Sequence, residues 1–232
     1  MSATAPVPPP GPLPGPCCDD ASPKRRAVLD SAARLFMAEG YAAVSMDAVA
    51  RAAQVSKATL YAHFPGKDAL FAEIVGNNCR RMQDEMASAA QAGTGHALAP
   101  ALAALGARWL RFLLEPRVRA LHRVVVAECI RAPELARAFY TAGPQALRHW
   151  LAGWLEEQAA RGQLRPGTDT VLVADQFLAL LRGDLFLRAT LGLADSPSEA
   201  EILALAREAA RAVVRLHGSP AALAAAETEG FA

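Results

Sequence analysis

Hydrophobic residues recur at helical spacing along most of the chain, and no stretch alternates convincingly as a strand would. In the first patterned segment the apolar positions lie three or four residues apart: Val28, Ala32, Leu35 and Phe36. Residues at this spacing fall on one face of a helix. Ser22 and Pro23 suit the N-cap and first position of such a helix, and Gly40 suits its end. We therefore predict a first helix from Pro23 to about Gly40.

Two short helices are predicted after this first one. Ser45 can cap a helix of about two turns, and Ser56 can cap the next, which must end at Pro65-Gly66. A long fourth helix follows from Lys67. Two short helices joined by a tight turn behind a longer helix form a helix-turn-helix, whose second short helix enters the major groove of DNA. The pattern thus predicts a DNA-binding unit.

The rest of the chain is divided by Gly and Pro into further segments with helical periodicity. We predict helices near 101–115, 118–130, 133–142, 145–161, 170–192 and 198–217. The fold class is therefore all-α, with a three-helix, helix-turn-helix DNA-binding domain at 23–70 and a helical-bundle domain for ligand binding and dimerisation at 71–220. A Pro/Ala/Gly-rich tail at 1–22 is expected to be disordered, and the C-terminus at 221–232 to be frayed.

The last two predicted helices, near 170–192 and 198–217, are apolar around more of their circumference than one core requires. Helices of this kind are buried on two sides. A four-helix interface with a twofold-related copy meets that need, and Leu181 and Val213 are candidate positions in it. The twofold axis of such a homodimer also places two DNA-binding units on a palindromic site.

The third helix carries the candidate base-reading residues. Leu60 and Phe64 lie one turn apart and are expected to face the core. The outer positions are then Lys57, Ala58, Thr59, Tyr61 and His63. The short side chains of Ala58 and Thr59 allow close approach to DNA, Thr59 can contact a thymine methyl or a phosphate, and Lys57 can reach guanine or phosphate.

The charge distribution agrees with a DNA-binding N-terminal part. Residues 23–81 contain nine Lys and Arg against five Asp and Glu, whereas the rest contains fifteen against eighteen. The most apolar stretch, 170–193, contains several charged residues and is not a membrane span. The first 22 residues lack the basic start and apolar core of a signal peptide. We expect a cytoplasmic protein whose four cysteines are idle thiols, and a redox sensor is the alternative.

Catalytic and metal-binding arrangements were considered as alternatives. His96, His122 and His149 with Glu128 and Asp175 have no ligand spacing within a helix, so no metal site is predicted. The sequence has no Gly-x-Ser-x-Gly elbow and no phosphate-binding glycine loop. A helical enzyme with an accidental helix-turn-helix would need a catalytic constellation, and we find none. We expect no enzymatic activity and no cofactor.

The run RRAVLDSAARLFMAEGYAAVSMDAVARAAQVSKATLYAHFPGKDALFAEIV, about fifty residues from Arg25, resembles the DNA-binding domain of TetR-family regulators. The resemblance implies a three-helix reading head and a dimerising, ligand-binding body. It implies phosphate contacts from Ser45, Tyr61, His63 and Lys67, and base contacts from Ser56, Lys57, Ala58 and Thr59. One departure is the turn Ala53-Gln54-Val55, where the family usually has glycine in the middle. More weakly, AECIRAPELARAFYTAGP and ADQFLALLRGDLFLRATLGL resemble the subgroup typified by AefR.

This family's division of labour implies a small organic effector bound in the body. Candidate apolar walls are Trp109, Phe112, Trp150 and Phe177, and candidate polar contacts are Arg131, Gln176 and Arg182. These aromatic residues could equally be core filler. The expected function is a repressor released from a pseudo-palindromic operator in double-stranded DNA by that effector. A DNA-binding protein without a small-molecule ligand is the rival, and a body filled by side chains would favour it.

Overall fold

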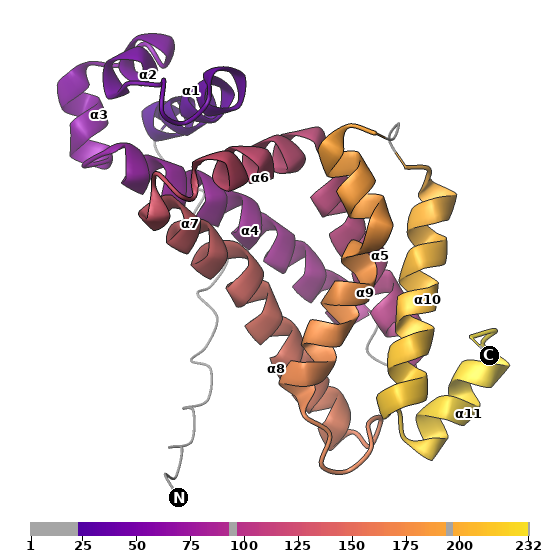
Figure 1. Ribbon diagram of the computed structural model, residues 1–232. Helices are drawn as coiled ribbons and strands as arrows, with labels where there is room; N and C mark the ends of the chain where they lie inside the picture. The colour runs from indigo at the N-terminus through magenta and orange to yellow at the C-terminus, as the bar shows by residue number, and fades with distance from the viewer. Residues whose placement is uncertain (1–22, 93–96, 194–196, 232) are drawn as a thin grey trace, which may run out of the picture.

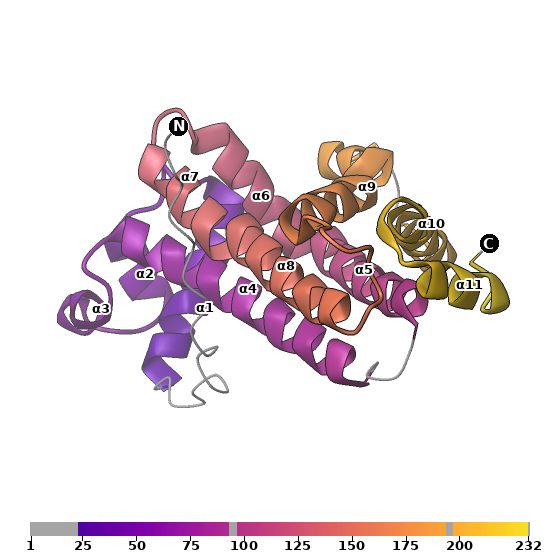
Figure 2. The same cartoon turned by 90° about the horizontal axis from the view of Figure 1, so that it is seen from below.

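The computed structural model describes residues 23–92, 97–193 and 197–231, and confirms the all-α prediction (Figures 1 and 2). The N-terminal helices are α1 (Pro23–Glu39), α2 (Met46–Ala52), α3 (Lys57–His63) and α4 (Lys67–Ala92). The others are α5 (Leu98–Leu114), α6 (Pro116–Glu128), α7 (Pro133–Tyr140), the π-helical turn η1 (Thr141–Gln145), α8 (Ala146–Ala160), α9 (Thr170–Leu191), α10 (Glu199–His217) and α11 (Pro220–Thr228). The expected tail at 1–22 and the Ser22 cap lie outside the described residues.

Helices α1 to α3 and the first turns of α4 form a head at one end of the molecule (Figure 1). The rings of Phe36, Tyr41 and Phe71 meet at its centre, with centroids 5.3 to 5.8 Å apart. The same apolar cluster includes Leu121 and Val125 of α6. The core of the head is therefore completed by a helix of the body.

The turn between α2 and α3 has the geometry of a Schellman motif. Gln54 has a φ of 54°, its N–H donates to Arg51 O (3.1 Å), and the Val55 N–H donates to Ala50 O (3.0 Å). The left-handed conformation costs a residue with a Cβ about 1 kcal/mol, which is why glycine is common at this position. The departure noted in the turn Ala53-Gln54-Val55 thus places a residue with a Cβ in a conformation that favours glycine.

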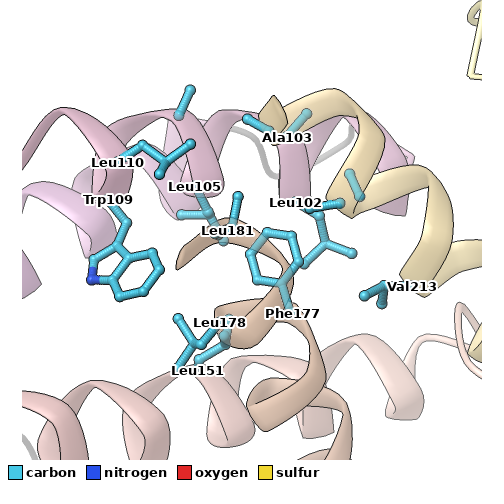
Figure 3. Close-up of a cluster of buried hydrophobic side chains, with 14 of the residues drawn as sticks. Leu102, Ala103, Leu105, Trp109, Leu110, Leu151, Phe177, Leu178, Leu181 and Val213 are labelled. Carbon is cyan, nitrogen blue, oxygen red and sulfur yellow. The ribbon is translucent and has the colours of Figure 1, made fainter. Parts of the chain in front are cut away.

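The body is built around α5, most of whose residues are buried. Helix α4 packs on one side of α5, and α9 and α10 lie on the other side (Figure 2). Side chains from α5, α8, α9 and α10 meet in this core, among them Leu102, Leu151, Phe177 and Val213 (Figure 3). Leu181 and Val213, expected at a dimer interface, are instead fully buried within the protomer, because they face α5.

One predicted break and one predicted continuity differ in the structure. Gly143-Pro144 was expected to separate two helices, but the chain runs from α7 into α8 through η1. Proline lacks an N–H, and a π-helical turn, where the hydrogen-bond ladder changes register, accommodates it. Helix α9 was expected to be unbroken, but Gly183 has non-helical φ and ψ angles of 29° and −158° and divides it into two arms.

The segment 221–232 was predicted to be frayed, and this prediction is wrong for its described part. Ser219 caps α11 by accepting a hydrogen bond from the Ala222 N–H (3.2 Å), and Pro220 opens the helix. Beyond its end, Phe231 is buried beneath the guanidinium of Arg207 (4.7 Å). Alanine has the highest helix propensity, so a capped and packed Ala-rich segment folds.

None of the helices within 23–92, 97–193 and 197–231 combines the length and apolarity needed to cross a membrane.

Replacing Gly106 by Val is expected to destabilise the protein by about 1–3 kcal/mol, since overpacking a filled core forces its neighbours apart. A Cβ at Gly106 would lie 3.0 Å from Phe177 Cζ and 3.1 Å from Leu181 Cδ2, and both side chains are fully buried. Thermal unfolding at fixed protein concentration measures the loss. The matched control is Gly153→Val on α8, where nothing lies within 4 Å of the added Cβ. Equal losses at both positions would contradict the close packing of α5 on α9.

Replacing Gln54 by Gly is expected to raise the melting temperature by about 2–4 °C, because glycine relieves about 1 kcal/mol of left-handed strain. The control is Gln54→Ala, which keeps a Cβ in the same conformation and brings no such gain. Differential scanning calorimetry of the wild-type protein and the two variants measures the three melting temperatures. A melting temperature that rises equally in both variants would show that the backbone at residue 54 is not the cause.

Candidate DNA-binding surface and internal pocket

Serine side chains define the starts of α2 and α3. Ser45 Oγ accepts a hydrogen bond from the Ala48 N–H (3.1 Å), and Ser56 Oγ accepts one from the Thr59 N–H (3.0 Å). Both N-caps were predicted from the sequence, and both side chains are exposed. Helix N-termini carry partial positive charge and attract anions. Two helix starts able to accept phosphate groups thus lie on the surface of the head.

The outer face of α3 presents the residues that the sequence placed there. Lys57, Ala58, Tyr61 and His63 are exposed and Thr59 is half-buried, whereas Leu60 and Phe64 are buried. Lys57 Nζ pairs with Asp47 of α2 (2.6 Å), and the hydroxyls of Ser56 and Thr59 lie 2.8 Å apart. The first turn of α3 therefore carries exposed hydroxyl groups and an ammonium group that can bind DNA bases or phosphates.

Lys67 has a more structural environment than the sequence indicates. Its Nζ donates to the carbonyl oxygens of Tyr41 (2.7 Å) and Val44 (3.1 Å), and lies 4.4 Å from the centre of the Tyr41 ring. The Tyr41 hydroxyl donates to Asp68, and burial together with this carboxylate raises the tyrosine pKa. These contacts hold the α1–α2 connection against the start of α4.

The body contains a cavity of about 270 Å³ between α4 and the later helices up to α9. Its walls are mainly aromatic and aliphatic. The aromatic residues around it are Trp109, Phe112, His122, Phe139, Tyr140 and Phe186. Polar groups are provided by Asn78 and Gln83 of α4 and by Arg182 of α9, and the thiol of Cys79 also faces it. An apolar cavity with a few polar groups is the usual form of a small-molecule site.

Three of the seven predicted pocket residues line this cavity: Trp109, Phe112 and Arg182. Trp150 and Phe177 pack in the core of the body, and Arg131 is exposed in the α6–α7 connection. Gln176 Oε1 lies 2.6 Å from His217 Nε2 of α10. None of these four residues lines the cavity, so their prediction as lining residues is not supported by the geometry.

His122, which the sequence reading weighed only as a metal ligand, is a wall residue of the cavity. Its ring makes edge contacts with Phe139 (5.8 Å between centroids) and Phe186 (5.4 Å). Its buried Nδ1 has no hydrogen-bond partner in the part of the chain that the structure describes. Burial, and secondarily the positive charge of Arg182, lowers the pKa of His122 below 6.5, so the ring is neutral at pH 7.

Two other groups in the wall have an altered affinity for protons. Burial raises the pKa of the Cys79 thiol to about 11, so it is uncharged at neutral pH. Arg182 is exposed at the surface, but its guanidinium lies 5.6 Å from the Trp109 ring centre, and partial desolvation beside the apolar wall lowers its pKa. Arginine stays protonated in proteins at neutral pH, so Arg182 brings a positive charge to the cavity.

The metal ligands considered from the sequence do not come together. Among the described residues no group of three His, Cys, Asp or Glu is placed to hold a metal ion. Asp175 pairs with Arg148 (2.6 Å between Oδ1 and Nε), and His96 lies outside the described residues.

The chain matches two protein-family models. Residues 28–74 match the bacterial regulatory proteins of the tetR family, and residues 100–218 match the C-terminal domain of AefR-like transcriptional repressors. The first match covers the head from α1 to α4, and the second covers the cavity helices from α5 onwards together with α10.

Named relatives and solved structures agree with these matches. The transcriptional regulator UidR of Escherichia coli (strain K12) is 24% identical over 175 residues, 72% of this chain and 82% of UidR. The structure of the flavonoid-responsive regulator FrrA is 36% identical, with a TM-score of 0.70 over 85% of this chain and 97% of FrrA. A putative TetR-family regulator from Mesorhizobium loti is 26% identical, with a TM-score of 0.76 over 86% and 98% of the two chains. With the helix-turn-helix in place, these likenesses show that the chain belongs to the TetR family of DNA-binding transcriptional regulators.

Proposed function

We propose that the protein is a homodimeric repressor that binds a pseudo-palindromic operator and is released from it by a small organic effector. The observation that carries this proposal is the aromatic-walled cavity of about 270 Å³ beside α6. Leu121 of α6 lines the cavity and is also part of the apolar cluster of the head. A ligand in the cavity therefore touches a side chain on which the packing of the head depends.

DNA contacts are assigned to the two helix starts and the outer face of α3. In this assignment Ser56, Lys57, Ala58 and Thr59 approach base edges in the major groove. Ser45, Tyr61 and His63 contact phosphates. Lys67 joins the phosphate contacts through its position at the start of α4, in addition to holding the α1–α2 connection. This division predicts different effects of substitutions on specific and nonspecific binding.

The dimer interface is assigned to the outer faces of α9 and α10. After burial of Leu181 and Val213 inside the protomer, large apolar side chains still remain exposed on these two helices: Leu172, Leu180, Leu187, Leu191, Leu203 and Leu216. Patches of this kind mark protein interfaces. Figure 1 shows α9 and α10 side by side, at a distance from the head. A twofold axis along this face would place two heads on successive major grooves.

Release is assigned to movement of α6. Arg119 and Arg123 of α6 donate to the carbonyl oxygens of Ala189 (2.7 Å) and Thr190 (3.3 Å) at the end of α9. Helix α6 thus contacts the head, the cavity and a helix of the proposed interface. An effector that binds tenfold better to a conformation with another spacing of the heads weakens operator binding tenfold, which corresponds to about 1.4 kcal/mol.

The relatives support the finer parts of this proposal. The family model that matches the body is described as that of a repressor, and FrrA is named as flavonoid-responsive. An occupied cavity in the body and repression relieved by a small organic molecule are consistent with both names. The alternative, a regulator that binds no small molecule, does not account for a cavity of this size.

The operator is identified by selecting bound duplexes from a random pool. Thr59→Ala is then expected to cost about 1–3 kcal/mol on the selected operator and little on unrelated DNA, because it removes a base contact. Tyr61→Phe is expected to weaken binding to both, because it removes a phosphate contact. Thr228→Val, which removes an exposed hydroxyl at the end of α11, far from the head (Figure 1), is the control. Fluorescence anisotropy at several salt concentrations measures all four proteins. If Tyr61→Phe affects only the selected operator, the phosphate assignment is wrong.

Leu180→Glu and Leu187→Glu are each expected to produce a folded monomer, because a carboxylate buried without a partner is unfavourable at an interface. Both leucines are half-exposed in the protomer, at 42% and 55%, so its own core is not disturbed. Val126→Glu, at a 60% exposed position on α6, is the control and should leave the dimer intact. Sedimentation velocity gives the mass, and circular dichroism checks folding. A wild-type protein that sediments as a monomer at micromolar concentration would exclude the proposed dimer.

A further inference from the structure

The charge of the cavity points to the chemistry of its ligand. We propose that the cavity binds an aromatic molecule carrying an acidic oxygen group, a carboxylate or a phenolate, which pairs with Arg182. The proposal rests on the effector function proposed above and names the class of effector.

Arg182 is the one ionised side chain among the residues that line the cavity, and neither Asp nor Glu is among them. Arg182 is exposed to solvent, its guanidinium lies over the face of the Trp109 ring (5.6 Å), and it takes part in no ion pair within the described residues. The acidic residues nearest to it along α9 have other partners, since Asp184 pairs with Arg188 (2.7 Å) and Asp175 with Arg148. The positive charge at the edge of the apolar cavity therefore has no counterion among the described residues.

An anionic ligand would supply that counterion. Charge pairs are stronger next to apolar walls than in water, and arginine binds carboxylates through two parallel hydrogen bonds. A cationic ligand would be repelled by Arg182, with no carboxylate in the wall to offset the repulsion. The Cys79 thiol is uncharged and does not alter this balance.

His122 provides a second polar contact. Its buried Nδ1 has no hydrogen-bond partner among the described residues, and an unsatisfied buried polar atom is unfavourable. The edge contacts with Phe139 and Phe186 fix the plane of its ring. A ligand oxygen or hydroxyl near Arg182 can satisfy this nitrogen, since the two side chains are close enough for the charge of one to affect the other.

The remaining walls favour a planar ring system. Trp109, Phe112, Phe139 and Phe186 come from three different helices and surround the cavity with aromatic faces and edges. Aromatic rings stack or pack edge to face on such walls and gain more than their buried area alone provides. The ligand is therefore an aromatic acid and not a flexible chain or a sugar.

Three compounds of nearly equal shape test the proposal: 2-naphthoate, its neutral amide 2-naphthamide and the cationic 2-naphthylmethylammonium. Calorimetric titration of the purified protein near neutral pH should show 2-naphthoate binding at least about tenfold more tightly than the amide, with the cation weakest. Arg182→Gln should reduce the preference for the anion to within about twofold without changing the affinity for the amide. Arg188→Gln, whose arginine pairs with Asp184 on the same helix, should keep the preference.

His122→Phe keeps a ring between Phe139 and Phe186 and removes the hydrogen bond, so it should weaken 2-naphthoate binding by about threefold or more. Thermal melts establish that each variant is folded. The proposal is overturned if the amide binds as well as the anion, if 2-naphthoate shows no binding up to about 1 mM, or if Arg182→Gln keeps the preference. An unchanged affinity in His122→Phe overturns the contact to Nδ1.

Operator binding with and without each compound separates this proposal from the one it rests on. If 2-naphthoate is preferred but no compound weakens operator binding, the ligand class stands and effector-controlled release fails. If a neutral compound releases the operator while 2-naphthoate does not bind, release stands and the ligand class is wrong.

Discussion

The architecture depends on α4 belonging to two hydrophobic cores at once. Its first turns bury Leu70 and Phe71 in the head, and its later turns bury Met82 and Met86 in the body. A continuous helix is stiff over its whole length. If one end of α4 changes direction, the other end therefore moves as well. Between these two buried ends, Asn78 and Cys79 face the cavity. The cavity thus lies where α4 passes from one core to the other.

Helix α6 borders the same junction. Leu121 faces the cavity and a smaller hollow of about 140 Å³ against α1, and Asn78 of α4 also borders both. The same two helices, α4 and α6, therefore pack against the head and form part of the cavity wall. The domain boundary proposed from the sequence at residue 70 falls inside α4. Hydrophobic packing between head and body continues across that boundary.

The parts of the structure that depend on neighbouring residues could be predicted from the sequence. Ser45 and Ser56 cap the helices they precede, and Gln54 has the positive φ that its place in the turn requires. The lining of the cavity could not be predicted in the same way. Phe177 and Phe186 are both aromatic residues of α9, yet one fills the core against Gly106 and the other faces the cavity. When a helix is apolar on several sides, the helices packed against it determine which side faces the cavity. The sequence of that helix alone does not contain this information. The capped helix α11 shows the opposite case, since Ser219-Pro220 is a local start signal that its Ala-rich context concealed.

Gly183 interrupts α9 directly after Arg182, and residues on both sides of the break line the cavity, with Arg182 before it and Phe186 after it. The break removes the rigid link that would make the direction of one arm follow the other. The shape of the cavity on this side is therefore not set by a single straight helix, and a change in the direction of one arm alters the cavity without requiring the other arm to turn with it.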